Sequence, residues 1–275
     1  MEKLLEIKNL TKKYYEGTTE NRVVDNVSME VKKGEFVVIM GASGSGKTSL
    51  LHLIAGIDTC DEGTVKYSIC PEGEGFGHMG EKAKAVFRRT NIGIVFQQQC
   101  LIPDLTVYEN IMLPMMLVRR PTGEKSHVGH GRGQDFRASR KETIFNLCSQ
   151  FGLKEHVSKY PSQLSGGQQQ RAAILRSVIN KPPILLCDEP TGSLNSAQTE
   201  LVMDLLNELN RQGQTIILVT HDMKVAIRGE RVVYIEDGRV EGELKFEKNE
   251  YEETEQERRN DREQKLMSFL GKRGW

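Results

Sequence analysis

No stretch of this sequence approaches the roughly 18 consecutive apolar residues that a helix needs to cross a bilayer. The first ten residues, MEKLLEIKNL, alternate charged with apolar side chains and lack the apolar core of a secretory signal peptide. We therefore expect neither a membrane span nor secretion. With 275 residues, of which 37% are hydrophobic, the chain is long enough for one large or two small domains.

An excess of charge and a cysteine framework are also missing. The 38 basic and 38 acidic residues cancel, so bulk electrostatics predicts neither nucleic acid nor an anionic membrane surface as a partner. The five cysteines are odd in number, scattered and never spaced as C-x-x-C, which favours reduced thiols in a cytosol over disulfides or a zinc site. They are Cys60, Cys70, Cys100, Cys148 and Cys187.

Apolar runs alternate with helical patterns, which predicts a parallel sheet with crossover helices. The run GEFVVIM is suited to a strand covered on both faces. The expected strands are 2–8, 21–31, 34–40, 183–189 and 215–222, the expected helices are 48–57 and 199–213, and residues 231–243 predict a hairpin with an Asp-Gly turn.

Two segments rich in glycine and charge, 70–82 and 119–140, are expected to be exposed loops inserted into the domain. The last thirty residues carry a charge run followed by an apolar tip, which predicts a solvated helix. That tip could dock on its own chain or on a partner. Its apolar residues are Leu266, Met267, Phe269, Leu270 and Trp275.

The stretch GASGSGKT, residues 41–48, fits the pattern G-x-x-x-x-G-K-[ST] between an expected strand and an expected helix. Glycines let successive backbone N–H groups turn toward phosphate oxygens, and the helix N-terminus adds its positive dipole end. Lys47 would bridge the terminal phosphates, and Thr48 would offer its hydroxyl to Mg²⁺. The expected nucleotide-binding residues are Gly41, Ser43, Gly44, Ser45, Gly46, Lys47, Thr48 and Ser49.

Two adjacent acids, Asp188 and Glu189, end the apolar run ILLC. In P-loop enzymes an acid at the end of a second buried strand holds Mg²⁺, which is the position of Asp188. Glu189 lies one residue further, where it could polarise an attacking water. The alternative for Glu189 is an acid at a helix start that complements the helix dipole.

The stretch LSGGQQQR, residues 164–171, lies between those two motifs. Ser165 is a natural helix N-cap, and Gly166 and Gly167 would expose backbone N–H groups at a second anion site. With all three motifs in this order, the chain resembles the ATP-binding subunits of ABC transporters over roughly residues 2–240. The resemblance implies an α/β P-loop NTPase fold with a parallel-sheet core, an antiparallel β subdomain and an inserted α-helical subdomain at about 98–160. Residues 241–275 would be a charged C-terminal extension.

The resemblance also implies two subunits packed head to tail around two ATP molecules, so that Ser165, Gly166, Gly167 and Gln168 of one subunit face the phosphate loop of the other. Gln97 is similar to the glutamine that reaches Mg²⁺ and the water, whereas Gln98 and Gln99 are expected to be surface residues. His221 resembles the switch histidine that contacts the γ-phosphate, and the alternative is a structural histidine. Tyr14 resembles the aromatic residue that stacks on adenine, with Tyr15 as the alternative.

One departure concerns the loop after the acids, which usually ends in aspartate. This chain has Ser193, Leu194 and Asn195 there, which leaves communication between the two ATP sites in doubt. Catalysis is expected to persist, because Glu189, Lys47 and His221 are intact.

The motifs are most similar to ATPases that drive permeases with a large extracytoplasmic domain, of the lipoprotein-releasing, macrolide or antimicrobial-peptide exporting and cell-division types. We therefore expect an ATPase at the cytoplasmic face of the membrane, bound to a separate permease that the 119–140 insertion could contact. One rival is a soluble ABC protein of DNA repair or translation, which usually has two cassettes or a long coiled-coil insertion. The other is a regulatory module, which rests on Asn195 alone.

Overall fold

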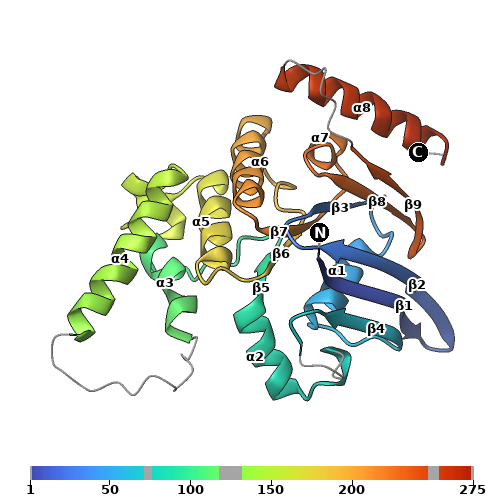
Figure 1. Cartoon of the computed structure of the whole chain (residues 1–275), viewed down its shortest axis with the longest axis horizontal. Helices are drawn as coiled ribbons and strands as arrows, with labels where there is room; N and C mark the ends of the chain where they lie inside the picture. Colours follow the sequence, from blue (N-terminus) through green and yellow to red (C-terminus); the bar gives the residue numbers. More distant parts are fainter. Residues whose placement is uncertain (1, 71–75, 118–131, 247–253, 274–275) are drawn as a thin grey trace.

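The computed structural model describes residues 2–70, 76–117, 132–246 and 254–273 (Figure 1). A six-stranded sheet lies at the centre, and its neighbouring strands are parallel except for the antiparallel pair β8 and β9. The strand order is β5 (Ile92–Val95), β6 (Ile184–Asp188), β7 (Thr215–Thr220), β3 (Phe36–Met40), β8 (Arg231–Glu236) and β9 (Arg239–Lys245). The predicted parallel sheet, its strands and the hairpin are confirmed.

Side chains of the central strands alternate between two apolar layers. Phe36, Val38 and Met40 of β3 enter the core on one face of the sheet, whereas Val37 and Ile39 enter the core on the other. All of these side chains are at most 1% exposed. A strand buried on both faces needs no polar alternation, which is why β3 appears in the sequence as a continuous apolar run.

Helices cover both faces of this sheet (Figure 1). On one face lie α3 (Val107–Leu117), α4 (Arg132–Gln150), α5 (Gly166–Val178), α6 (Ser196–Arg211), α7 (Met223–Ala226) and α8 (Glu255–Gly271), and on the other lie α1 (Lys47–Ala55) and α2 (Glu81–Asn91). Short 3₁₀ turns are η1 (Phe76–His78), η2 (Lys154–His156) and η3 (Pro161–Gln163). Among the described residues, every helix is too short or too polar to cross a membrane.

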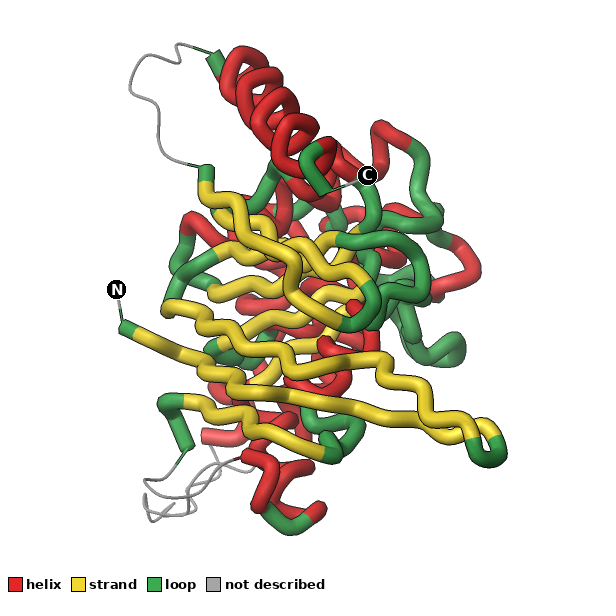
Figure 2. The backbone as a smooth tube through the Cα atoms, turned by 90° about the vertical axis from the view of Figure 1, so that its right-hand side faces the viewer, coloured by secondary structure: helices red, strands yellow, loops and turns green. Residues whose placement is uncertain are grey.

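A second, antiparallel sheet packs over α1 and has the order β2 (Thr19–Lys32), β1 (Lys3–Glu16) and β4 (Glu62–Tyr67). The β1–β2 hairpin extends beyond the rest of the molecule at one end (Figure 2). Its strands are longer than the sequence predicts because bulges interrupt the apolar alternation. Asn9 and Asn26 adopt positive φ values of 48° and 54° at this irregular part of the hairpin.

The prediction that residues 70–82 and 119–140 are exposed loops is partly wrong. Residues 132–140 belong to α4, whose later turns bury Ile144 and Cys148 completely. Helix formation is cooperative. The packing of the later turns of α4 therefore favours helix in its polar first turns as well. In the other segment, the ring of Phe76 is 1% exposed and packs 4.9 Å from the ring of Phe87. Residues 71–75 and 118–131 lie outside the described part of the chain.

The C-terminal segment docks on its own chain. β9 continues to Lys245, so a boundary at residue 240 falls inside the β8–β9 hairpin. Leu266 and Leu270 of α8 lie one turn apart and are buried in the same core as α7. Arg259 of α8 donates to Glu200 of α6 at 2.9 Å. The helix predicted from the sequence therefore exists, and Leu266 and Leu270 of its apolar tip belong to the core. Phe269 is partly buried, Met267 is exposed, and Trp275 lies outside the described residues.

We expect Leu266→Ala to lower the free energy of unfolding by about 2–4 kcal/mol, because the substitution leaves a cavity in a packed core. The matched control is Met267→Ala on the same helix, where the side chain is 49% exposed and the change should stay within about 0.5 kcal/mol. Urea denaturation followed by circular dichroism measures both. Equal losses for the two variants would contradict the docking of α8 through Leu266.

Candidate nucleotide site

The phosphate loop connects β3 to α1, as predicted, and its backbone requires glycine at two positions. Gly44 and Gly46 have φ values of 82° and 93°, in the left-handed region that glycine adopts without strain. Gly46 is the N-cap of α1 and offers no capping side chain, so the first N–H groups of the helix are available to an anion. Ser43 and Gly44 are exposed and Ser49 is half-buried.

Lys47 begins α1 and is almost completely buried, with 5% of its surface exposed. Its ammonium donates to the carbonyl oxygen of Ala42 at 2.5 Å. Burial lowers the pKa of Lys47, and the charges of Glu189 and Asp188 act in the opposite direction. The amine is therefore held under the loop, close enough to both acids to feel their charge.

Thr48 and Asp188 come together from α1 and the end of β6. The Thr48 hydroxyl donates to Asp188 Oδ1 at 2.9 Å. Burial raises the pKa of Asp188, and this hydrogen bond partly offsets the rise. Hydroxyl and carboxylate oxygens are hard ligands of the kind that Mg²⁺ prefers. No group of three or more histidine, cysteine or acidic side chains forms a metal site among the described residues, so a Mg²⁺ ion here would need phosphate oxygens and water as further ligands.

Glu189 leaves β6 with a φ of 41°, a conformation that costs energy for a residue with a side chain. Its backbone N–H donates to the carbonyl of Val219 at 3.0 Å, which holds the turn. Its Oε1 lies 3.0 Å from Nδ1 of His221, just beyond the end of β7. A carboxylate can only accept, so the proton of this contact is on Nδ1. The strained turn thus aims an acid at a histidine.

Gly192 brings Gln97 into the same place. A Cβ added at Gly192 would lie 3.3 Å from Gln97 Nε2 and 3.3 Å from Glu189 Oε2. The absence of a side chain at Gly192 lets Gln97 and Glu189 approach each other. The sequence analysis did not predict this role of Gly192. The only signal was a glycine soon after two acids. A cavity of about 280 Å³ lined by Glu189, Gly192 and His221 opens beside it.

The predicted signature forms a capped helix start. Ser165 caps α5, its hydroxyl accepting from the Gln168 backbone N–H at 3.3 Å while the Gln168 side-chain oxygen accepts from Ser165 N–H at 2.9 Å. Ser165 and Gly166 are exposed, whereas Gly167 is buried against Gln198 of α6. The helices that follow the two anion sites, α1 and α5, lie on opposite faces of the sheet. The signature is therefore separate from the phosphate-loop group of its own chain.

Tyr14 is fixed by contacts that the sequence analysis did not anticipate. Its hydroxyl donates to Asp58 Oδ2 at 2.7 Å, and the Lys12 ammonium lies 5.1 Å from the ring centroid. The ring still has 44% of its surface exposed. Tyr15 is more exposed and its hydroxyl contacts Glu20. Tyr14 thus has a defined orientation and a free surface, but it lies outside the hydrogen-bonded group around Asp188.

The atypical Asn195 is the N-cap of α6. Its side-chain oxygen accepts from the backbone N–H of Gln198 at 2.9 Å. Asparagine and aspartate cap helices about equally well, so the missing charge does not disturb this end of α6. Leu194, one residue earlier, lies against the signature, 3.4 Å from the position of a Cβ on Gly166. Ser193 completes this exposed loop.

Comparisons with known proteins agree with this geometry. Residues 24–192 match the family model described as ABC transporter. Two ABC transporter ATP-binding proteins of Methanocaldococcus jannaschii are similar: MJ0796 is 41% identical over 245 residues, 88% of this chain and 97% of the relative, and MJ1508 is 39% identical over 237 residues, 86% of this chain and 97% of the relative.

The structure of MJ0796 as a dimeric, post-hydrolysis ATP-binding cassette bound to ADP and Pi has a TM-score of 0.75 to this chain at 38% identity. It covers 90% of this chain and 100% of that chain. The matched family model spans more than half of the sequence, and the fold of the relatives includes both sheets and the helical layer. The chain therefore belongs to the ABC transporter family and has that family's ATPase cassette fold.

Proposed function

We propose that this chain is the ATP-hydrolysing subunit of an ABC exporter or mechanotransmission complex, and that two copies enclose two ATP molecules. The observation that carries the proposal is one group of contacts: Thr48 on Asp188 at 2.9 Å, beside Glu189 on His221 at 3.0 Å. These contacts bring together the phosphate loop, the acid that would bind the metal (Asp188) and the base Glu189, which is held by His221. Their combination is what ATP hydrolysis requires.

The phosphate loop binds the triphosphate. The N–H groups between Gly41 and Thr48 surround the phosphate oxygens. The Lys47 ammonium gives up its hydrogen bond to the Ala42 carbonyl and donates to the phosphate oxygens instead. The loss of water on burial, which lowers the pKa of Lys47, is offset once a phosphate with several negative charges lies beside it. The adenine ring stacks on the exposed face of Tyr14.

Thr48 and Asp188, whose oxygen atoms lie 2.9 Å apart, would hold a Mg²⁺ ion together with Gln97 from the segment that follows β5. Bound there, Mg²⁺ supplies positive charge to the phosphate oxygens. The residues of the chain do the rest. Glu189 accepts a proton from water as the water oxygen attacks the terminal phosphorus, and the bond to the ADP oxygen breaks. His221 fixes Glu189 through Nδ1, and with its second nitrogen Nε2 also protonated it would donate a hydrogen bond to the terminal phosphate.

A second copy completes the site. The exposed N-terminus of α5, with Ser165 and Gly166, has the chemistry of an anion site but lies across the sheet from α1. A head-to-tail pair would place it over the nucleotide of the partner. MJ0796, a relative of matching length, has been solved as a dimer with ADP and Pi, which supports this arrangement.

A separate permease would bind the helical region at about 98–160. Large apolar side chains are exposed there, as expected of a surface that meets a protein partner. They are Ile102, Met116, Leu117 and Tyr160. We propose a permease with a large extracytoplasmic domain, which would place the cassette at the cytoplasmic face of the membrane. In this organisation the nucleotide-binding domain would extend through the β8–β9 hairpin to Lys245, and the C-terminal extension would follow it.

We predict that Glu189→Gln lowers steady-state ATP turnover at least about 100-fold, because a general base contributes roughly that factor or more. ATP-driven dimerisation should persist, since the phosphate and metal ligands are untouched. The control is Asp222→Asn, which removes one negative charge from the same cavity and keeps an N-cap for α7. Phosphate release and size-exclusion chromatography measure the two properties. Near-normal turnover in Glu189→Gln would exclude Glu189 as the base.

Lys47→Ala should weaken ATP binding about 10- to 100-fold, because it removes a charge-assisted hydrogen bond to the phosphates. Lys66→Ala, at an exposed position of β4, is the control. Titration with a fluorescent ATP analogue measures the dissociation constant. Unchanged affinity in Lys47→Ala would contradict the assignment of the phosphate loop.

Asn195→Asp should leave the turnover rate within about twofold and the Hill coefficient for ATP unchanged, because the cap of α6 is equally good with either residue. Asn195→Ala, which removes the capping oxygen, should cost about 1 kcal/mol of stability. A clear rise in the Hill coefficient of Asn195→Asp would instead mean that the missing charge limits communication between the sites. That result would favour the regulatory alternative.

A further inference from the structure

The turn between β8 and β9 lies directly against the phosphate loop. Asp237 and Gly238 have φ values of 45° and 77°, as a tight two-residue hairpin turn requires. The N–H of Gly238 donates to the carbonyl of Ser45 in the phosphate loop at 3.2 Å. The carbonyl of Gly238 accepts from the N–H of Asp25 in β2 at 2.9 Å. One residue thus joins the phosphate loop to the antiparallel sheet.

The junction is packed backbone against backbone. A Cβ added at Gly238 would lie 2.8 Å from the carbonyl oxygen of Val23, and one added at Gly46 would overlap the same oxygen and lie 3.5 Å from Gly238 Cα. The atoms nearest to both of these positions belong to the backbone and not to flexible side chains. A movement of the turn is therefore transmitted directly to Ser45 and Gly46.

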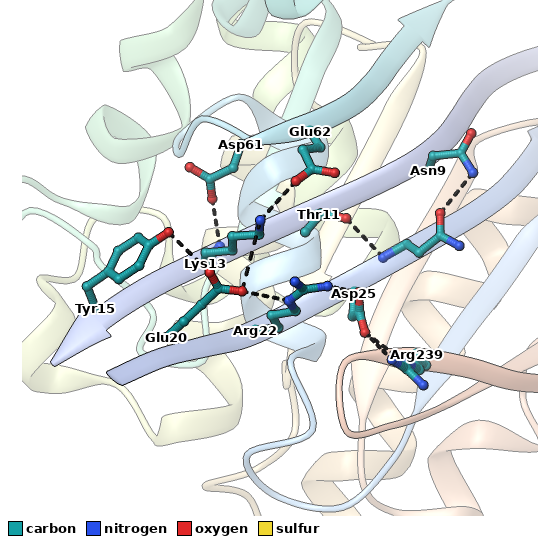
Figure 3. Close-up of polar contacts among 11 residues, drawn as sticks. Asn9, Thr11, Lys13, Tyr15, Glu20, Arg22, Asp25, Asp61, Glu62 and Arg239 are labelled. Atoms are coloured by element: carbon teal, nitrogen blue, oxygen red, sulfur yellow. Dashed lines mark hydrogen bonds and ion pairs between the residues drawn. The ribbon is translucent and has the colours of Figure 1, made fainter. Parts of the chain in front are cut away.

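An ion pair between Asp25 of β2 and Arg239 connects the same two segments near the protein surface. The Asp25 oxygen Oδ2 accepts from Arg239 Nε at 2.7 Å and from Arg239 Nη2 at 2.5 Å (Figure 3). Arg22 approaches the other carboxylate oxygen at 3.6 Å. The Asp25 side chain is 10% exposed and that of Arg239 is 65% exposed. Arg239 is the first residue after the turn, so its pairing with Asp25 fixes the turn against β2.

We propose that Asp25 and Arg239 are positioning residues for the phosphates of the nucleotide: they clamp the β8–β9 turn against the phosphate loop and thereby set the affinity for ATP. The inference rests on the proposed function, because it assumes that the loop binds phosphate. The pair touches neither the base Glu189 nor the metal ligands, so it acts on binding rather than on the chemical step. A purely structural pair would affect stability without a selective effect on ATP.

The test uses Asp25→Asn and Arg239→Met in the full-length chain. We expect the KM for ATP and the dissociation constant of a fluorescent ATP analogue to rise roughly fivefold, which corresponds to about 1 kcal/mol, with kcat within about twofold. Glu241→Gln is the matched control, since it removes one negative charge from the groove that Asp25 and Arg239 line without touching the junction.

Hydrogen exchange provides a direct readout. The amides of residues 43–47 should exchange faster in Asp25→Asn, and those of residues 3–7 in β1 should not change. Unchanged KM in both single variants would overturn the inference, as would a rise in KM that is accompanied by equally large losses of kcat and of the folded fraction. Lys47→Ala separates the two proposals: if it weakens ATP binding while Asp25→Asn does not, only the clamp is wrong, and if Lys47→Ala has no effect, the phosphate site itself is wrong.

Discussion

The parallel alignment of four strands is the constraint on which the candidate site depends. Met40 of β3 pairs with Thr220 of β7, and Asp188 of β6 pairs with Val219. The carboxyl ends of these strands are therefore level to within a residue, and the segments that follow them meet at one edge. The phosphate loop, the acid pair and His221 are such segments, and Gln97 follows β5 in the same way. Ligands of open α/β sheets bind at this edge for the same reason.

This arrangement concentrates charge in a poorly solvated place. Burial acts against the charged forms of both Lys47 and Asp188, lowering the pKa of the first and raising that of the second. Their mutual attraction and the Thr48 hydrogen bond offset part of that cost. The positive φ of Glu189 is a further cost, which the rigid strands on either side can sustain. In the proposed reaction the burial of the two charges is useful, because a polyanionic nucleotide with its cation offsets it on binding.

The sequence predicts the strands and helices at this edge of the sheet well because each part has a local signature. An apolar run, a glycine pattern or an acid pair lies within a few residues, and β3, β6, β7, α1 and α6 are found where they are expected. What the sequence could not predict depends on contacts between distant segments. Phe76 is buried by an aromatic partner across a polar stretch, and the beginning of α4 forms in a segment with loop composition. Gly192 matters only because Gln97 and Glu189 converge on it, and Gly238 only because Ser45 and Asp25 lie on its two sides.

The same reasoning explains why the signature need not face its own phosphate loop. The first turn of any α-helix has N–H groups without intrahelical partners, and the capping box of α5 engages the N–H groups of Ser165 and Gln168. The exposed Gly166 between them is open to an anion. Since α5 and α1 pack on opposite faces of the sheet, we propose that the phosphate that reaches this helix start is held by another chain. In the proposed dimer, the triphosphate would then neutralise two positive helix ends at once, and hydrolysis would weaken the interface because it removes the phosphate that both chains share.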